Sequence, residues 1–257
     1  TDQDEMSERL IEHTVAQAAA FPQFTVAANS RMAAEDWAEA TGFPLSRMYV
    51  LYNGLDPDAV GTPRTVPSTR AASAPFVLGT VSRFAPVKDP LLWVKVARHV
   101  ARHYPDIRLL LVGDGPMRPK MVERLAAYGL LDQTEMPGLV TSGIGGYLRR
   151  MDVFLMTSRT ESLPNSIIEA QLAGVPVVAT DVGGVCEAVA SADAATLVAD
   201  RDPEHLAKAV LAFLGDLDRR RRVADEAPGL TADRFSLARQ LVATRAAYGW
   251  PTQEDLS

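Results

Sequence analysis

The feature that most constrains the fold is a series of short, wholly apolar runs that alternate with segments of helical character. Leu109–Val112 is the plainest of these runs. Strands that are apolar throughout are covered on both faces, and strands joined by helices run parallel. The sequence therefore predicts an α/β fold with a doubly wound parallel sheet, which binds ligands at the carboxyl ends of its strands. The predicted strands are 76–82, 107–112, 135–136, 153–157, 177–180 and 196–199, and the predicted helices are 90–103, 116–128, 144–150, 166–173, one from about 185, 203–215, 217–226 and 232–248.

A change in composition near residue 51 divides the chain. Before it, the pattern predicts a helix over 7–20, a strand over 24–28, a helix from the N-cap Asn29–Ser30 to about Ala40 and a strand over 48–52. Residues 51–75 are rich in Ser, Thr, Ala and Pro, as is typical of a linker. We therefore expect four parts: 1–50, a linker over 51–75, the main domain over 76–230, and a C-terminal helix and tail over 231–257.

Charge and residue usage exclude several classes of protein. The net charge of -6 argues against nucleic acid as a partner, because a surface for phosphate backbones needs a basic excess. Cys186 is the only cysteine, which precludes an intrachain disulfide and fits a cytoplasmic location. His99 and His103 have helical spacing but no evident third ligand, so no metal site is predicted. No apolar run reaches the roughly 18 residues that a membrane-spanning helix requires.

The strand predicted over 153–157 leads into a turn and a helix that each contain a glutamate. Glu161 lies in the turn, and Glu169 follows eight positions later inside the helix. A strand-to-helix turn presents backbone N–H groups and a helix N-terminus, which suit an anionic group. Carboxylates beside such a site are better suited to sugar hydroxyls. The run therefore indicates a ligand that carries both phosphate and hydroxyl groups, such as a nucleotide sugar.

The turns after other predicted strands add cations and glycines. These are Arg83 and Lys88 after the first strand, Gly113–Pro116 after the second, Pro137–Leu139 after the third and Gly183–Gly184 after the fifth. Arg and Lys in one loop can clamp a diphosphate, and glycines allow a close backbone approach. Each turn alone could equally be an ordinary surface loop or strand-to-helix connection. Because all of them fall at one sheet edge, together they predict a site for a nucleoside diphosphate that carries a polyol.

An ordered set of segments resembles a known enzyme family. The segments are Leu51–Asp56, Gly79–Lys88, Leu111–Pro116, Pro137–Gly138, Ser158–Glu169 and Ala173–Gly184. In this order they resemble the C-terminal, donor-binding half of a GT-B fold glycosyltransferase of family 4, the retaining nucleotide-sugar enzymes also called group 1. Glu161 and Glu169 match the family's E-x7-E pattern. The resemblance spans roughly residues 50 to 190 and implies a Rossmann-like domain.

The resemblance also implies roles for individual residues. Arg83 and Lys88 would hold the donor diphosphate and stabilise the leaving nucleotide, and Glu161 would lie near the donor sugar. Glu169 would bind the ribose hydroxyls. The remaining substrate-binding residues would be Leu163, Pro164 and Asn165 at the sugar and phosphates, Gly138 and Leu139 at the base, and the turn glycines Gly113, Gly183 and Gly184. Such enzymes usually need no metal, so no cofactor is expected beside the UDP- or GDP-sugar substrate.

Two departures from the family pattern matter. Many members have Gly-Phe-Gly where this chain has Ser162–Pro164, and Pro164 lacks a backbone N–H. In addition, residues 1–50 match only the end of the N-terminal, acceptor-binding half. We therefore expect this chain alone to be inactive, and the glycan or lipid-linked acceptor and any peripheral contact with the inner face of the membrane to involve the missing half. Aromatic and apolar residues near the C-terminus are expected to pack on that half: Phe235, Leu241, Tyr248 and Trp250.

The resemblance implies transfer of a hexose in polysaccharide or glycoconjugate biosynthesis. The main alternative is a non-catalytic nucleotide-sugar-binding module, or one half of a two-chain enzyme. Another enzyme class on the same architecture, a nucleotide-sugar epimerase or a phosphorylase-like enzyme, is a further alternative. A phosphorylase would need a lysine bound to a pyridoxal cofactor, and the sequence shows no such lysine context.

Overall fold

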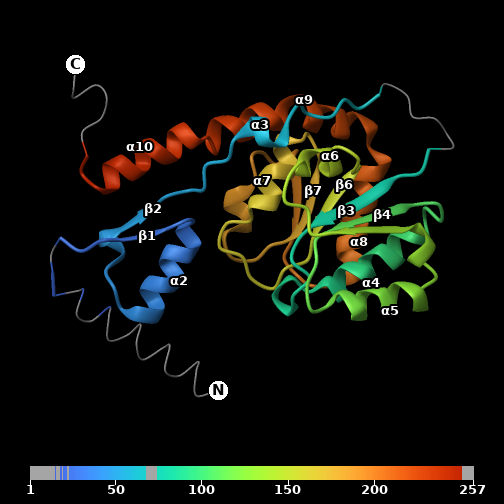
Figure 1. Cartoon of the computed structure of the whole chain (residues 1–257), viewed down its shortest axis with the longest axis horizontal. Coiled ribbons are helices and arrows are strands. Elements are labelled where there is room, and N and C mark those ends of the chain that lie inside the picture. The colour runs from blue at the N-terminus through green and yellow to red at the C-terminus, as the bar shows by residue number, and fades with distance from the viewer. Residues whose placement is uncertain (1–14, 16–17, 19, 22, 68–73, 251–257) are drawn as a thin grey trace.

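A computed structural model describes residues 15, 18, 20–21, 23–67 and 74–250, and Figure 1 shows two α/β units of unequal size. Most of the helix predicted over 7–20 lies outside these residues. The larger unit contains a six-stranded sheet between layers of helices. The smaller unit contains two strands and a helix, and the C-terminal helix extends towards it across the top of the view (Figure 1).

The larger sheet confirms the predicted fold class. Its strand order is β5-β4-β3-β6-β7-β8, and every neighbouring pair is parallel. The chain starts in the middle at β3, builds outward to β5, and then returns to the other side of β3 with β6. This reversal between β3 and β6 is the topological switch point at which such sheets bind ligands. The strands are β3 (Val77–Val81), β4 (Arg108–Val112), β5 (Thr134–Gly138), β6 (Val153–Met156), β7 (Val177–Thr180) and β8 (Ala195–Val198).

Helices cover both faces of this sheet, and alternate strand residues point into two separate cores. Leu109 and Leu111 of β4 face one core, whereas Leu110 and Val112 face the other. The first core is completed chiefly by α4, α5 and α8, and the second chiefly by α6 and α7. The helices of the larger unit are α3 (Pro57–Val60), α4 (Pro90–Ala101), α5 (Arg118–Ala127), α6 (Ile144–Leu148), α7 (Asn165–Leu172), α8 (Pro203–Gly215) and α9 (Leu217–Arg234), with short 3-10 segments η2 (Pro86–Lys88), η3 (Leu131–Gln133) and η4 (Gly183–Ala188).

The smaller unit is built from β1 (Val26–Ala28), α2 (Arg31–Thr41), η1 (Leu45–Arg47) and β2 (Met48–Val50). As the sequence predicts, the Ser30 side chain caps α2, accepting from the N–H of Ala33 at 3.0 Å. Glu187 of the larger unit binds the first turn of the same helix, accepting from the N–H groups of Arg31 and Met32 at 2.8 and 2.9 Å. Tyr52 donates its hydroxyl to Glu187 at 2.8 Å. One carboxylate from the larger unit thus holds the smaller unit at two points.

The C-terminal helices correct part of the sequence interpretation. The predicted end of a helix at residue 226 is wrong, because α9 continues through Pro228 to Arg234, and the next helix, α10 (Leu237–Ala247), starts five residues later than predicted. Proline removes one helical hydrogen bond, but burial of neighbouring Ala227 and Thr231 outweighs that cost. Phe235 is not a surface residue: it is 2% exposed and packs edge-on against Tyr52. Leu241, Tyr248 and Trp250 are exposed, as predicted.

Candidate functional site

The turns after β3 and β6 bring two of the predicted catalytic residues together. Lys88, the last residue of η2, places Nζ 2.5 Å from Oε1 of Glu161, which lies in the turn between β6 and α7. The two side chains are 27% and 8% exposed, so water screens this ion pair only partly. The pair lies at the switch point of the sheet, where a ligand is expected.

Hydrogen bonds from three hydroxyl side chains connect this pair to the neighbouring turns. Ser158 donates its hydroxyl to the same Glu161 oxygen at 2.5 Å. Thr157 donates to the carbonyl oxygens of Lys88 and Asp89, at 3.2 and 3.0 Å. Thr180, at the end of β7, donates to the carbonyl oxygen of Ser158 at 2.7 Å. These bonds therefore connect the turns after β3 and β6, which hold the ion pair, with the end of β7.

The other two predicted charged residues have a different environment. Within the described part of the chain, the side chains of Arg83 and Glu169 have neither a hydrogen-bond partner nor an ion-pair partner. Arg83 is exposed, whereas Glu169 is half-buried. Burial raises the pKa of the Glu169 carboxyl above its usual range, because a desolvated carboxylate is less stable than the neutral acid. A half-buried acid without a protein partner is suited to accept hydrogen bonds from a ligand.

The predicted glycines are required by close packing of the turns. A Cβ on Gly113 would lie 1.9 Å from the carbonyl oxygen of Ser82, and one on Gly183 would lie 2.0 Å from that of Glu161. Both residues also have positive φ angles, of 131° and 51°. The N–H of Gly113 donates to Gly138, and the N–H of Gly184 donates to Glu161, at 2.9 and 3.0 Å. The N–H groups of Gly113 and Gly184 are thus already bound by the protein, and Gly113 and Gly183 shape the edge of the site through close packing.

The remaining predicted residues follow β5, at one end of the sheet, and β6, beside the switch point. Leu139 is 77% exposed and follows β5, on the β4 side of the switch point. Leu163 and Pro164 are buried at the start of α7, so Leu163 could reach a ligand only through its backbone. Asn165 is exposed, and its side chain accepts from the amide of Asn53 at 2.7 Å. The structure thus brings Lys88 together with Glu161, and Gly113 together with Gly138. The first pair lies between β3 and β6, whereas the second lies on the β4 side of β3.

Several residues at the site were not predicted from the sequence. Asp89 and Arg201 form an ion pair with an Oδ2 to Nη2 distance of 2.7 Å, and Arg201 also binds the turn that contains Ser158. Glu187, which holds α2, was likewise unassigned. The Asp89–Pro90 pair is a recognisable helix start, and Asp89 does cap α4. Nothing in the sequence near Arg201 indicates its partners.

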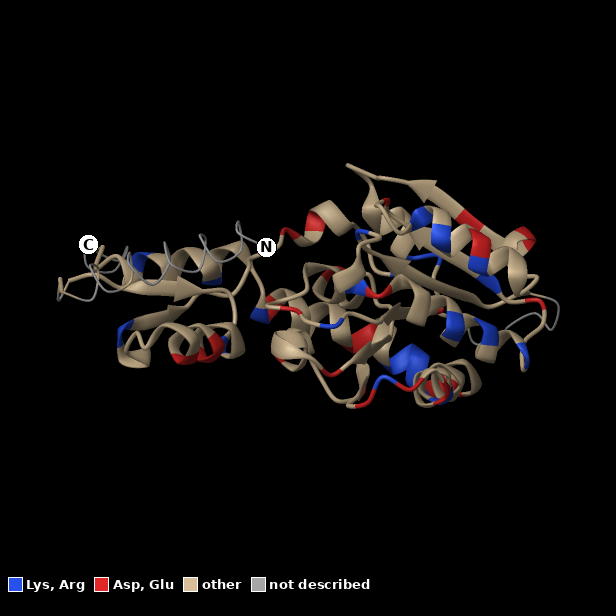
Figure 2. Cartoon of the chain, turned by 90° about the horizontal axis from the view of Figure 1, so that it is seen from below, with Lys and Arg blue, Asp and Glu red and all other residues tan. Residues whose placement is uncertain are grey.

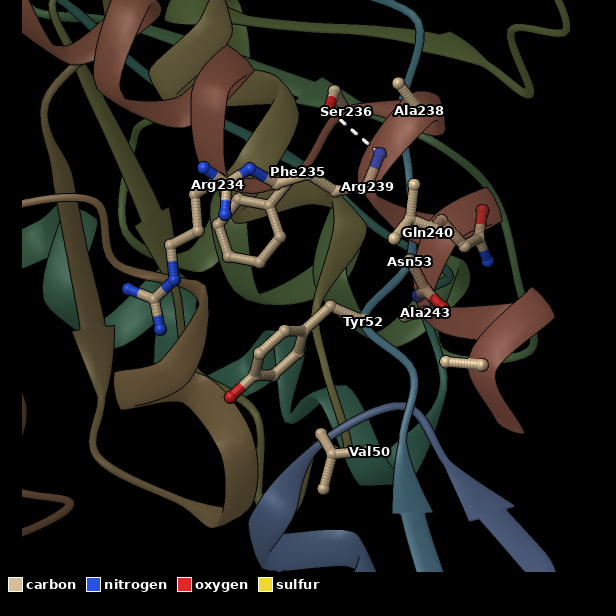
Figure 3. Close-up of a pocket in the computed structure, with 12 residues that line it drawn as sticks. Val50, Tyr52, Asn53, Arg234, Phe235, Ser236, Ala238, Arg239, Gln240 and Ala243 are labelled. Carbon is tan, nitrogen blue, oxygen red and sulfur yellow. Dashed lines mark hydrogen bonds between the residues drawn. The ribbon is translucent and has the colours of Figure 1, made fainter. Parts of the chain in front are cut away.

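A separate pocket of about 600 Å³ lies between the segment after β2 and the C-terminal helices. Figure 3 shows Tyr52 and Phe235 on one side of it and Ala238, Gln240 and Ala243 on the other. Its lining is largely apolar, and the Tyr52 hydroxyl is already bound to Glu187. None of the four predicted charged residues lines this pocket: Arg83, Lys88, Glu161 and Glu169.

Lys and Arg are interspersed with Asp and Glu over the larger unit (Figure 2). Within the described ranges, no three His, Cys, Asp or Glu residues come together as a metal site requires. None of the described helices combines the length and apolar character needed to cross a membrane.

Comparison with known proteins gives consistent matches along the chain. The most informative curated relatives are the Vi polysaccharide biosynthesis protein VipC/TviE of Salmonella typhi, 32% identical over 66% of this chain and 30% of the relative, and the D-inositol 3-phosphate glycosyltransferase of Corynebacterium urealyticum, 35% identical over 77% and 50%. This chain therefore spans at most about half the length of these relatives.

Solved structures share the fold at lower identity. HepE of Anabaena in complex with UDP has a TM-score of 0.78 at 22% identity, over 94% of this chain and 68% of that chain. TarM of S. aureus has a TM-score of 0.76 at 18% identity, over 95% and 46%. The model of the family "Glycosyl transferases group 1" matches residues 63–229, well over half of the chain. The chain therefore belongs to the group 1 glycosyltransferase family, and contains the C-terminal half of its GT-B fold.

Proposed function

We propose that this chain is the donor-binding part of a retaining hexosyltransferase that uses a UDP- or GDP-sugar. The observation that carries the proposal is the Lys88–Glu161 pair at the switch point of the sheet, with Arg83 in the same loop and without a side-chain partner among the described residues. This arrangement supplies two cations for a diphosphate and one acid for the sugar that the diphosphate carries.

In this proposal the two cations act on the leaving group. When the bond between the sugar and the diphosphate breaks, negative charge builds up on the departing phosphate oxygens. Arg83 binds them through its planar fork, and Lys88 binds them as a compact charge. Stabilising this developing charge is the largest contribution that a preorganised site makes to such a reaction. The same chemistry makes a metal ion unnecessary in the proposed mechanism.

The acidic and backbone groups bind the rest of the donor. Glu161 lies beside the sugar, and Glu169 accepts hydrogen bonds from the ribose hydroxyls. The N-terminus of α7, with Leu163 and Pro164 just before it and Asn165 as its first residue, faces the sugar and phosphates; the N–H donors there come from residues other than Pro164, which has none. The exposed segment at Gly138 and Leu139 meets the base. The glycine turns at 113, 183 and 184 hold these elements close enough together for one ligand to contact all of them.

The names of similar proteins support the choice of donor and pathway. HepE was solved with UDP, with UDP-glucose, and with UDP and glucose. The Salmonella relative is named for the biosynthesis of a polysaccharide. We therefore favour a UDP-hexose as donor, and polysaccharide or glycoconjugate synthesis as the process.

The acceptor is assigned to residues outside this chain. Curated relatives are about two to three times as long as the region matched, and the described residues of the smaller unit form two strands. We propose that a second Rossmann-like half completes this unit, binds a glycan or lipid-linked acceptor, and makes any contact with the inner face of the membrane from the cytoplasm. The alternative, a binding module without catalysis, requires the same donor site but no acceptor site.

Transfer and its stereochemistry test this proposal. A protein that carries this chain together with an N-terminal half is incubated with UDP- and GDP-hexoses and a glycan acceptor, and the anomeric configuration of the product is determined by NMR. We expect transfer with retained configuration, and negligible transfer by the 257-residue chain alone. An inverted product would exclude the retaining mechanism, and full activity of the chain alone would exclude the assignment of the acceptor site.

A further inference from the structure

Lys88 is followed by a residue whose backbone conformation is unusual. Asp89 has φ 42° and ψ 59°, and it is the one non-glycine residue with positive φ among the residues that the structure describes. The left-handed conformation is unfavourable for most side chains, although Asp tolerates it better than most. Such a conformation persists only where the surroundings fix it.

Three hydrogen bonds to the Asp89 carboxylate fix it here. Oδ1 accepts from the N–H of Leu92 at 3.2 Å, which caps α4. Oδ2 accepts from Arg159 and from Arg201, each at 2.7 Å. The Asp89 side chain is 15% exposed, and those of Arg159 and Arg201 are 61% and 31% exposed. Arg201 is thus the more shielded of the two partners.

Arg201 also binds the turn that holds Glu161. Its Nη1 donates to the carbonyl oxygen of Ser158 at 2.6 Å, and its Nη2 donates to that of Thr157 at 3.2 Å. Ser158 in turn donates its hydroxyl to Glu161, and Lys88 closes the ring by binding the same carboxylate. One guanidinium from the segment after β8 therefore connects the residue next to Lys88 with the residue that orients Glu161.

The geometry points to Arg201 as a positioning residue for Lys88 and Glu161. Its side chain forms no hydrogen bond or ion pair with either charged group in the described structure, so its effect passes through Asp89 on one side and Ser158 on the other. Holding both turns in place before a ligand arrives lowers the entropy that binding must remove. Arg201 therefore raises the affinity of the site for the diphosphate. This inference rests on the proposed function, because it assigns Lys88 to the donor diphosphate.

Arg159 provides a matched control. It binds the same Asp89 oxygen at the same distance, but its side chain forms no other hydrogen bond or ion pair within the described residues and is more exposed. If only the charge on Asp89 mattered, removal of either arginine would have the same effect. If the connection between the turns matters, only removal of Arg201 has a large effect.

The test combines a measurement without ligand and one with ligand. The chain has four lysines, so the ¹⁵N ammonium signals of Lys88, Lys95, Lys120 and Lys208 can be resolved and assigned with Lys88→Arg. In Arg201→Ala we expect the Lys88 signal to move towards that of the exposed Lys95. In Arg159→Ala we expect it to stay in place.

Titration with UDP and GDP, and with their nucleosides, measures the consequence. We expect Arg201→Ala to weaken binding of the diphosphate about 3- to 10-fold and to leave nucleoside binding unchanged. In a Lys88→Ala background the same substitution should have no further effect, because residues that act through one another are not additive. Arg201→Lys should recover part of the loss, and it serves as the test if Arg201→Ala does not fold.

The outcomes separate this inference from the proposed function. An unchanged Lys88 signal in Arg201→Ala, or an equal loss of affinity with and without Lys88, would overturn the positioning role. Absence of diphosphate binding by the parent chain would count against the proposed function, while the ammonium signals would still decide whether Arg201 holds Lys88 in place.

Discussion

Two parts of the candidate site differ in how far the protein satisfies its own charged groups. Lys88 and Glu161 are bound to each other, and Ser158, Asp89 and Arg201 hold the turns on which they lie. Arg83 and Glu169 have neither hydrogen-bond nor ion-pair partners among the described residues. The first part is thus preorganised by the protein, whereas the second is left for a ligand to complete.

This difference has an energetic consequence. A ligand that binds Arg83 or Glu169 displaces only water from their side chains. A diphosphate that binds Lys88 must compete with the Glu161 carboxylate, which is nearly buried. We therefore expect removal of Arg83 to reduce ligand affinity with little change in stability. Changes to the paired residues should also alter the stability of the ligand-free chain.

The largest effect on binding is expected for Arg83→Ala. Hydrogen bonds to charged groups contribute about 1.5–3 kcal/mol, so affinity for the nucleoside diphosphate should fall about 10- to 150-fold. The melting temperature should not change, because Arg83 makes no side-chain bond in the described structure. Arg102→Ala, at an exposed position just after α4, is the control. Loss of stability without loss of affinity would reverse the assignment of Arg83.

Glu169→Gln should weaken nucleotide binding by about 3- to 10-fold, because the amide oxygen still accepts a hydrogen bond but no longer carries the charge that strengthens it. It should also stabilise the ligand-free chain. Because burial raises the pKa of Glu169 above 4.5, folding favours the neutral acid at low pH, and this contribution is lost as the pH rises through the raised pKa. Because glutamine is neutral at every pH, the variant avoids the cost of burying a charged carboxylate.

Thermal melting at two pH values checks the sign of this effect. The gain in stability of Glu169→Gln over the parent should be present at pH ~7 and absent at pH ~4, where the parent carboxyl is also neutral. A gain that was larger at the lower pH would show that a buried charge is not the cause.

Glu161→Gln should strengthen binding of the diphosphate, by about 2- to 5-fold. The substitution keeps the size of the side chain but removes the charge that holds Lys88 and repels the phosphates. Transfer by the longer protein should fall at the same time, because the acid beside the sugar is lost. Weaker diphosphate binding in calorimetric titrations would mean that the ion pair helps the site rather than competing with the ligand.

The smallest effect on binding is expected for Glu187→Ala, which lies outside both parts. Its carboxylate accepts from two N–H groups of α2, and although burial alone would raise its pKa, these bonds and the Tyr52 hydroxyl lower it overall. Loss of a helix cap costs about 0.5–2 kcal/mol, so the free energy of unfolding should fall by that amount. Nucleotide affinity should be unchanged.

The sequence predicted the elements of the larger unit well, because the apolar runs that form its strands are local features. The strand at 177–180 was predicted to the residue, and the helix at 203–215 likewise. The turns that follow the strands were also predicted, since glycines and charged residues mark them. The turns after β3 and β6 meet because these two strands are neighbours in the sheet. The predicted alternation of strands and helices does not specify that strand order.

Contacts between distant residues were beyond the reach of the sequence. Asp89 and Arg201 are 112 positions apart, and Glu187 and Met32 are 155 apart. The burial of Phe235 was missed for the same reason, because its aromatic partner is Tyr52. The helix end predicted at residue 226 was wrong because the packing of buried Ala227 and Thr231 outweighs the local preference of Pro228 to end a helix.

The most direct test of the donor site is calorimetric titration of this chain, and of Lys88→Ala, with UDP, GDP and ADP and with the corresponding nucleosides. We expect one diphosphate to bind more tightly than its nucleoside, and this preference to be smaller in Lys88→Ala, in which Arg83 remains. If no diphosphate binds more tightly than its nucleoside, or if the preference is undiminished without Lys88, the sheet edge at Lys88 and Glu161 is not the diphosphate site.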